Sequence, residues 1–261
     1  MDAFPLWVLS GATLLAVIVA IEGGYRLGAA AHARSEDEKE SPVSAIAATI
    51  LALLAFMMAF TFGIVSDRYD ARKALVREEA NAIRTAWFRS DFLPEPDRSR
   101  AVSLLKDYVD GRVAAVQSGD VARVRRAGVE TVRIQRELWD MAVANARKDM
   151  NSDVAALYIE SLNDVSNIHA SRMAVGLNTR IPSGIWLAFY ALVILSMVGV
   201  GYHAAIAGSR RSGIMLILAL SFSLVITLIA ALDRAQGGYL PVSQQPLQDV
   251  RSLMDSGGST R

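Results

Sequence analysis

Three bulky apolar residues and two arginines follow one another at four-residue steps in one stretch of the chain. Phe56, Phe60 and Ile64 are followed at the same spacing by Arg68 and Arg72. In a helix such residues share one face, which drifts slowly around the axis. In a ring of subunits the apolar side chains would form stacked collars able to gate by dewetting. Arginines at the mouth would concentrate anions. The spacing therefore predicts a pore neck followed by an anion-concentrating mouth.

A simpler interpretation of these five residues stays open. Phenylalanine and isoleucine in a transmembrane helix usually face lipid or pack against neighbouring helices. Arginines just outside a span usually anchor its topology, or pair with nearby acids. On that interpretation the stretch carries no pore.

A charged pair stands at the end of the first apolar run. Glu22 precedes Arg26 by four residues, which is the favourable order for an ion pair within a helix. We expect an ion pair at the membrane interface here, rather than a proton relay.

No catalytic or metal-binding motif is found in the sequence. The three histidines, His32, His169 and His203, lie in unrelated segments, and the chain has no cysteine. No glycine-rich phosphate loop, GxSxG or HExxH motif is present. A net charge of +1 excludes a nucleic-acid binder driven by bulk charge. We therefore expect no enzymatic activity, no cofactor, no bound metal and no nucleic-acid partner.

The apolar residues are gathered in runs long enough to cross a bilayer. The chain is 52% hydrophobic over 261 residues. A hydrocarbon core about 30 Å thick needs roughly 20 apolar residues in a helix. Four runs meet this length: residues 5–21, 43–65, 185–207 and 213–232. The first could instead be a signal peptide, but it lacks a positively charged leader. We therefore predict a polytopic all-α protein embedded in a lipid bilayer, with four transmembrane helices.

These spans divide the chain into four parts. Residues 1–65 hold two spans and their connecting loop, and residues 182–235 hold the other two. Residues 66–181 form a helical soluble domain between them, and residues 236–261 form a C-terminal tail. An even number of spans puts both termini and the soluble domain on one side.

Positive charge near the spans favours the cytoplasm for that side. The flanking charges on that side are Arg68, Arg72, Lys73, Arg77, Arg172, Arg180 and Arg234. Those on the other side are Arg26, Arg34, Lys39, Arg210 and Arg211. We expect a multi-pass protein of the bacterial inner membrane, with the termini and residues 66–181 cytoplasmic.

The second span continues into the soluble domain without a break. No proline interrupts residues 43–92, so we predict one helix of roughly 50 residues. Pro94 and Pro96 end it. Further helices are predicted over residues 97–117, 121–148 and 153–178, with Asp120 as an N-cap.

Several short motifs resemble those of the bestrophin-like membrane proteins of bacteria. They are residues 59–62 (AFTF), 81–83 (NAI), 93–96 (LPEP) and 243–247 (SQQPL). The likeness covers nearly the whole chain. A weaker likeness to bacterial bestrophins rests on two short stretches. One holds Asp67, Arg68 and residues 71–73 (ARK) after the second span, and the other is residues 233–249, which hold a Pro-Leu pair after the last span.

Bestrophins are homopentameric anion channels with a narrow apolar neck on the second span. The resemblance implies a homo-oligomer, with a pentamer as the bestrophin precedent, that conducts small anions such as chloride. The calcium-binding acids of bestrophins are not recognisable here. The alternative hypothesis is a non-conducting membrane scaffold or sensor whose helical domain binds a protein partner.

Overall fold

The chain folds as two compact helical units. A computed structural model of the protein describes residues 5–33, 40–118, 120–178, 180–209, 213–234 and 241–258. Within these ranges every regular element is helical and no strand is present. The span unit comprises Met1–Asp67 and Arg180–Arg234, and the domain unit comprises Arg68–Thr179 and Ala235–Arg261. The predicted all-α class is confirmed.

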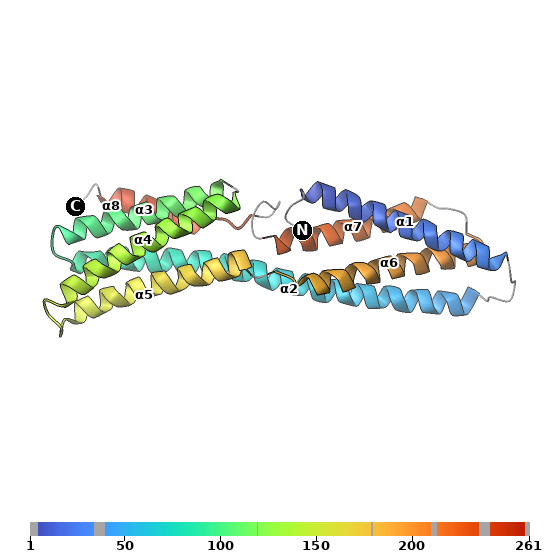
Figure 1. Ribbon diagram of the computed structural model, residues 1–261, viewed down its shortest axis with the longest axis horizontal. Coiled ribbons are helices and arrows are strands. Elements are labelled where there is room, and N and C mark those ends of the chain that lie inside the picture. Colours follow the sequence, from blue (N-terminus) through green and yellow to red (C-terminus); the bar gives the residue numbers. More distant parts are fainter. Residues whose placement is uncertain are drawn as a thin grey trace. The chain divides into compact units, whose positions relative to one another are not determined.

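Among the residues that the structure describes, four helices are long and apolar enough to cross a membrane, as predicted. They are α1 (Leu6–His32), α2 (Glu40–Arg89), α6 (Ser183–Ile206) and α7 (Gly213–Asp233). In the span unit α1 packs against α6 and α7, as Figure 1 shows. α1 runs eleven residues past the predicted end of its apolar run, and residues 22–32 contain no proline to end it.

Glycines allow α1 and α6 to approach each other closely. A Cβ atom at Gly24 would lie 2.1 Å from the carbonyl oxygen of Val198. One at Gly201 would lie 2.0 Å from the carbonyl oxygen of Ile21. Small residues bring helix backbones together in membranes, where van der Waals packing drives association. This interface therefore requires glycine at both positions.

Hydrogen bonds between helices complete the packing of the span unit. Thr13 Oγ1 lies 3.0 Å from the hydroxyl of Tyr190, which joins α1 to α6. Ser223 Oγ on α7 donates to the carbonyl oxygen of Ser10 at 3.1 Å. Ser196 Oγ on α6 lies 3.5 Å from the carbonyl oxygen of Ile50 on α2. Hydroxyls often join transmembrane helices in this way.

Helix α2 is a single helix of 50 residues, about 75 Å long at 1.5 Å per residue. A 3₁₀ turn, Ser90–Phe92, follows it and leads to the prolines that end the helix. The predicted uninterrupted helix is therefore confirmed.

The domain unit is a bundle built on the second part of α2. The other members are α3 (Asp97–Gln117), α4 (Val121–Ala146) and α5 (Asp153–Met173), which ends in a π-helical turn at Ala174–Asn178. α3 packs on α4, and α4 packs on α5. Asp120 caps α4 as predicted, because its carboxylate accepts from the Ala122 N–H at 2.8 Å.

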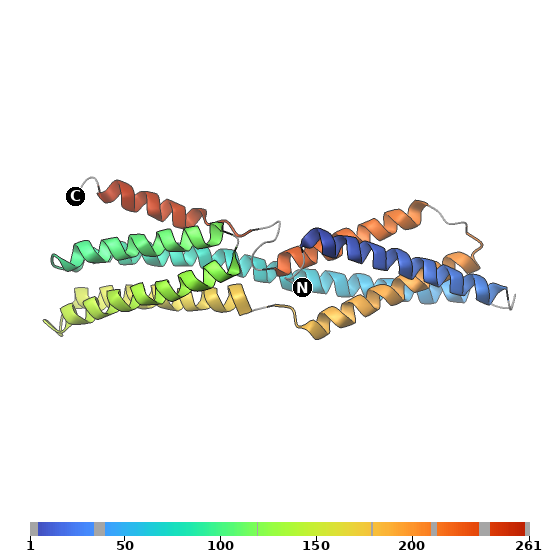
Figure 2. The same ribbon diagram turned by 45° about the horizontal axis from the view of Figure 1, so that its top comes forward.

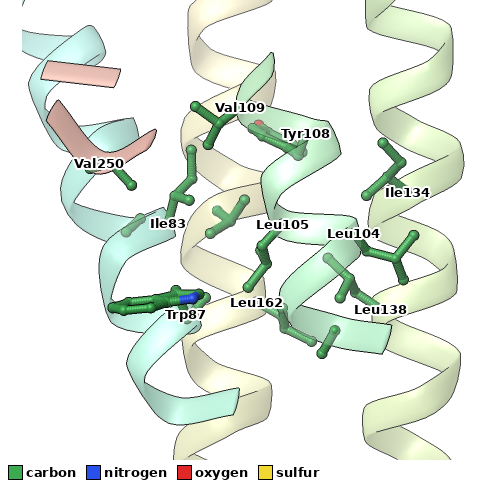
Figure 3. Packing of buried hydrophobic residues seen from close by; sticks show 14 of the residues in the cluster. Ile83, Trp87, Leu104, Leu105, Tyr108, Val109, Ile134, Leu138, Leu162 and Val250 are labelled. Carbon is green, nitrogen blue, oxygen red and sulfur yellow. The ribbon is translucent and has the colours of Figure 1, made fainter. Parts of the chain in front are cut away.

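The core of the domain unit combines side chains from every one of these helices. Figure 3 shows Trp87 and Ile83 of α2 facing Leu105 and Tyr108 of α3. Leu138 of α4 and further residues of α5 lie against the same cluster. Burial of this apolar surface drives the helices together.

A further helix, α8 (Gln245–Gly258), lies in the segment predicted to be a C-terminal tail. Figure 2 shows it beside α3. Leu247, Val250 and Met254 belong to the domain core. At the surface, Arg251 Nε and Lys106 Nζ each lie 2.5 Å from a carboxylate across this contact. The apolar spacing of three and four residues makes this segment an amphipathic helix that covers the bundle.

Four charges used to predict the orientation lie outside the described residues: Arg34, Lys39, Arg210 and Arg211.

Candidate functional site

Two of the three predicted neck residues, Phe56 and Phe60, lie on a side of α2 that the described part of its own chain leaves open. Phe56 is 66% exposed and Phe60 is 60% exposed, while Ile64 is partly buried. The Phe56 and Phe60 rings are stacked with centroids 6.5 Å apart. This face is therefore available to lipid or to a second copy of the chain.

The opposite side of α2 faces the rest of the span unit. Leu54, Met58 and Val65 are buried there, each 9% exposed or less. Residues two positions apart point to nearly opposite sides of a helix. The register that buries Leu54 and Met58 consequently turns Phe56 and Phe60 outward.

The two predicted mouth residues differ in exposure. Arg68 is partly buried, and Arg72 is only 8% exposed. The guanidinium carbon of Arg72 lies 5.9 Å from the centroid of the Tyr69 ring, within range of a cation–π interaction. Arg68 is thus the more accessible of the two charges within a single chain.

Glu22 and Arg26 form an ion pair on α1. Arg26 Nε lies 2.7 Å from Glu22 Oε1, and the side chains are 75% and 33% exposed for Arg26 and Glu22 respectively. An exposed pair at this spacing contributes only a few tenths of a kcal/mol.

A buried polar cluster, whose members are not among the predicted site residues, lies in the domain unit. Glu79 of α2 is fully buried and accepts a hydrogen bond from the Tyr108 hydroxyl at 2.7 Å. Arg112 Nε lies 3.4 Å from the same carboxylate, and Arg172 also pairs with it. His169 Nδ1 lies 3.8 Å away. We call these five residues the Glu79 cluster.

The Glu79 cluster also holds the C-terminal segment. Arg172 Nη2 donates to Gln244 Oε1 at 3.1 Å, just before α8 begins. Gln244 Nε2 in turn donates to the carbonyl oxygen of Val242 at 2.9 Å. One carboxylate therefore ties together α2, α3, α5 and, through Arg172, the segment leading into α8.

Burial sets the charges of the Glu79 cluster. Burial and the nearby Arg112 guanidinium lower the pKa of His169 to about 4, so the imidazole is neutral at pH 7. Burial lowers the pKa of Arg172 to about 10, which leaves it charged. Burial raises the pKa of Tyr108 to about 12. The buried Glu79 side chain thus faces two guanidinium groups and a neutral imidazole in the core.

A sequence signal for the Glu79 cluster does exist. Glu79 lies three residues after Val76 and four before Ile83, so it occupies the apolar stripe of α2. Arg172 continues the stripe of α5 in the same way, after Val165 and Ile168. A charged residue within an apolar stripe lies at a position that folding buries, and a buried charge needs a partner.

Among the described residues no group of three or more His, Asp or Glu side chains is placed to hold a metal ion.

Solved structures share this fold over nearly the whole chain. A crystal structure of a bestrophin homologue from Klebsiella pneumoniae, phased by Zn-SAD, has a TM-score of 0.68. It is 15% identical and covers 95% of this chain and 97% of its own. A crystal structure described as a membrane protein has a TM-score of 0.68 at 16% identity, covering 97% of both chains. At this identity the likeness establishes the fold.

The sequence itself matches a protein family. Among curated proteins, no sequence matches the chain. The Bestrophin-like domain matches residues 13–247, which run from within α1 to the start of α8 and include the other three spans and α3 to α5 of the domain unit. With the same fold found independently in the Klebsiella homologue, the chain belongs to the Bestrophin-like family.

Proposed function

We propose that the protein is a homo-oligomeric anion channel in the bacterial inner membrane. In this proposal the Phe56, Phe60 and Ile64 face of α2 lines a central axis between copies. The observation that carries it is the exposure of two stacked phenylalanines on a spanning helix whose other side is packed. Bestrophins are anion channels in general, and family membership supports the same class of function here.

The neck would act as an apolar constriction. Stacked aromatic rings from several copies would exclude water, and conduction would require the constriction to become wetted. Arg68 and Arg72 would follow at the mouth, on the cytoplasmic side in the predicted orientation. Since Arg72 is largely buried, we assign most of the attraction for chloride or similar anions to Arg68.

The test is anion flux through purified protein in liposomes. Phe60→Ala should widen the constriction and raise chloride flux above the wild-type rate. Phe62→Ala is the matched control, because Phe62 is 39% exposed on a different side of the same helix. Equal flux from the two variants would remove Phe60 from the pathway, and absence of flux from all three folded proteins would refute conduction.

A second candidate function is a membrane scaffold whose domain unit binds a protein partner. Val129 and Val132 of α4 are 75% and 57% exposed, and Met150 is 79% exposed. Exposed apolar side chains of this size often mark contact surfaces. Absence of anion flux, together with loss of a captured partner on Val129→Asp, would favour this candidate.

A further inference from the structure

A pocket of about 430 Å³ opens in the span unit where α6 begins and α7 ends. This volume is within the range of cavities that hold small molecules. Its lining is mostly apolar and includes Arg180, Ile181, Trp186, Leu187, Tyr190 and Asp233.

Fixed aromatic rings form one wall of the pocket. Trp186 is 7% exposed and packs edge-on against Phe189, with ring centroids 5.8 Å apart. The centroid of the Trp186 ring also lies 5.9 Å from the centroid of the Tyr190 ring. The Tyr190 hydroxyl is held by Thr13 of α1 at 3.0 Å. This wall is therefore already shaped without a ligand.

Two charged side chains, Arg180 and Asp233, also line the pocket. Asp233 is 8% exposed, and its Oδ1 accepts from the Ile181 N–H at 3.1 Å, which fixes the segment that carries Arg180. Arg180 is only partly buried. A guanidinium has five N–H donors, so Arg180 can satisfy an acceptor within the protein and still bind an anionic oxygen.

The position of the pocket along the membrane-spanning helices indicates which part of the bilayer lies beside it. α6 begins at Ser183 and α7 ends at Asp233, so the pocket lies at one end of two membrane-spanning helices. Tryptophan and tyrosine concentrate at this level, beside lipid headgroups. Leu187, at 74% exposed, extends the apolar lining outward.

We propose that this pocket binds one phospholipid, with its phosphate on Arg180 and an acyl chain along Trp186 and Leu187. Free phosphate would leave the apolar walls uncovered, whereas a phospholipid offers an acyl chain to those walls and a phosphate to the N–H donors of Arg180. A phospholipid thus matches both the apolar and the basic side chains of the lining. This site does not depend on whether the protein conducts anions.

The experiment is a titration of purified protein in detergent with phosphatidylglycerol, followed by native mass spectrometry. Arg180→Gln should lower lipid affinity on the order of tenfold, as expected for loss of one charge-assisted contact. Arg180→Lys should retain most of it. Leu187→Gln should also weaken binding. Diacylglycerol with the same acyl chains, which lacks the phosphate, should bind wild type no better than phosphatidylglycerol binds Arg180→Gln.

Two matched variants control for loss of charge and of apolar surface elsewhere in the span unit. Arg26→Gln changes an exposed arginine of α1, and Leu216→Gln changes a 52% exposed leucine of α7. Both should bind phosphatidylglycerol like wild type. Equal affinity of Arg180→Gln and wild type, or equal binding of the two lipids by wild type, would overturn the proposal.

A cross-linking test asks whether a second copy of the chain fills the pocket instead. The chain has no cysteine, so Leu187→Cys introduces a single reactive thiol. Resistance of the bilayer-embedded protein to disulfide formation between copies is the expected result. Efficient formation of a covalent dimer would show that another copy covers the pocket and would overturn the lipid assignment.

Discussion

Replacing Glu79 with glutamine should destabilise the domain unit strongly, because it removes the carboxylate from a buried set of charges. Glutamine has nearly the same shape, so the packing of α2 is preserved. Arg112 and Arg172, 3% and 9% exposed respectively, would then face each other without the acid that pairs with both. The Tyr108 hydroxyl could still donate to the amide oxygen.

The expected loss follows from the burial of these groups. Removing one partner of a buried ion pair costs about 3–5 kcal/mol, since the charge left behind is neither hydrated nor paired. Glu79 serves two guanidinium groups, so we expect a value in the upper part of this range. For a domain of this size the loss corresponds to a fall in the unfolding midpoint on the order of 10 °C or more.

Tryptophan fluorescence during thermal unfolding measures this effect in the domain unit. Trp87 is buried in the domain core and Trp139 packs against it. Replacing Trp7 and Trp186 with phenylalanine in every protein compared restricts the signal to these two residues. Glu78→Gln is the matched control, because Glu78 is the preceding residue and is exposed. Its expected change is within about 0.5 kcal/mol.

A loss below about 1 kcal/mol for Glu79→Gln would refute this reasoning. Such a result would mean that the two arginines reach water or other acceptors once the carboxylate is gone. A similar loss in both variants would assign the effect to surface charge on α2.

Three further predictions concern other parts of the chain. Burial lowers the pKa of His169 to about 4, below the unfolded value of 6.5. The unfolded state therefore binds the proton more readily, and the folded state loses about 3 kcal/mol of stability as the pH falls from 6.5 to 4. His169→Gln should remove this part of the acid sensitivity in a titration of unfolding midpoint against pH, and an unchanged profile would contradict it. Gly201→Leu should separate α1 from α6, because even a Cβ atom would lie 2.0 Å from the Ile21 carbonyl oxygen. Size-exclusion chromatography should then show no monodisperse protein. Gly63→Leu should leave the protein monodisperse, because the space around its Cβ is open. Arg68→Glu should lower the chloride-to-sodium preference measured by reversal potential in bilayers; an unchanged preference would make Arg68 a topology anchor.

The spans and the long helix could be predicted because they rest on local features of the chain. An apolar run of about 20 residues has few alternatives to a transmembrane helix. The charged continuation after Ile64 contains no proline before Pro94, so nothing ends α2 earlier. The Asp120 cap follows from a single side chain beside its own helix.

Features that depend on distant residues were missed. α8 is short, and its three apolar side chains indicate a packed helix only once α3 is known to lie beside them. α3 lies well over 100 residues earlier in the chain. The Glu79 cluster joins residues 79, 108, 112, 169 and 172, and no local pattern specifies such a set. Burial of Arg72 likewise depends on tertiary packing, which its spacing from Arg68 does not reveal.

The most direct test of the proposed function is chemical block of flux at position 60. The chain has no cysteine, so Phe60→Cys carries one thiol that a charged thiosulfonate reagent can modify. Modification should abolish chloride flux through Phe60→Cys in liposomes and leave flux through Phe62→Cys unchanged. Full modification of Phe60→Cys, confirmed by mass, with undiminished flux would contradict a pore lined by this face of α2.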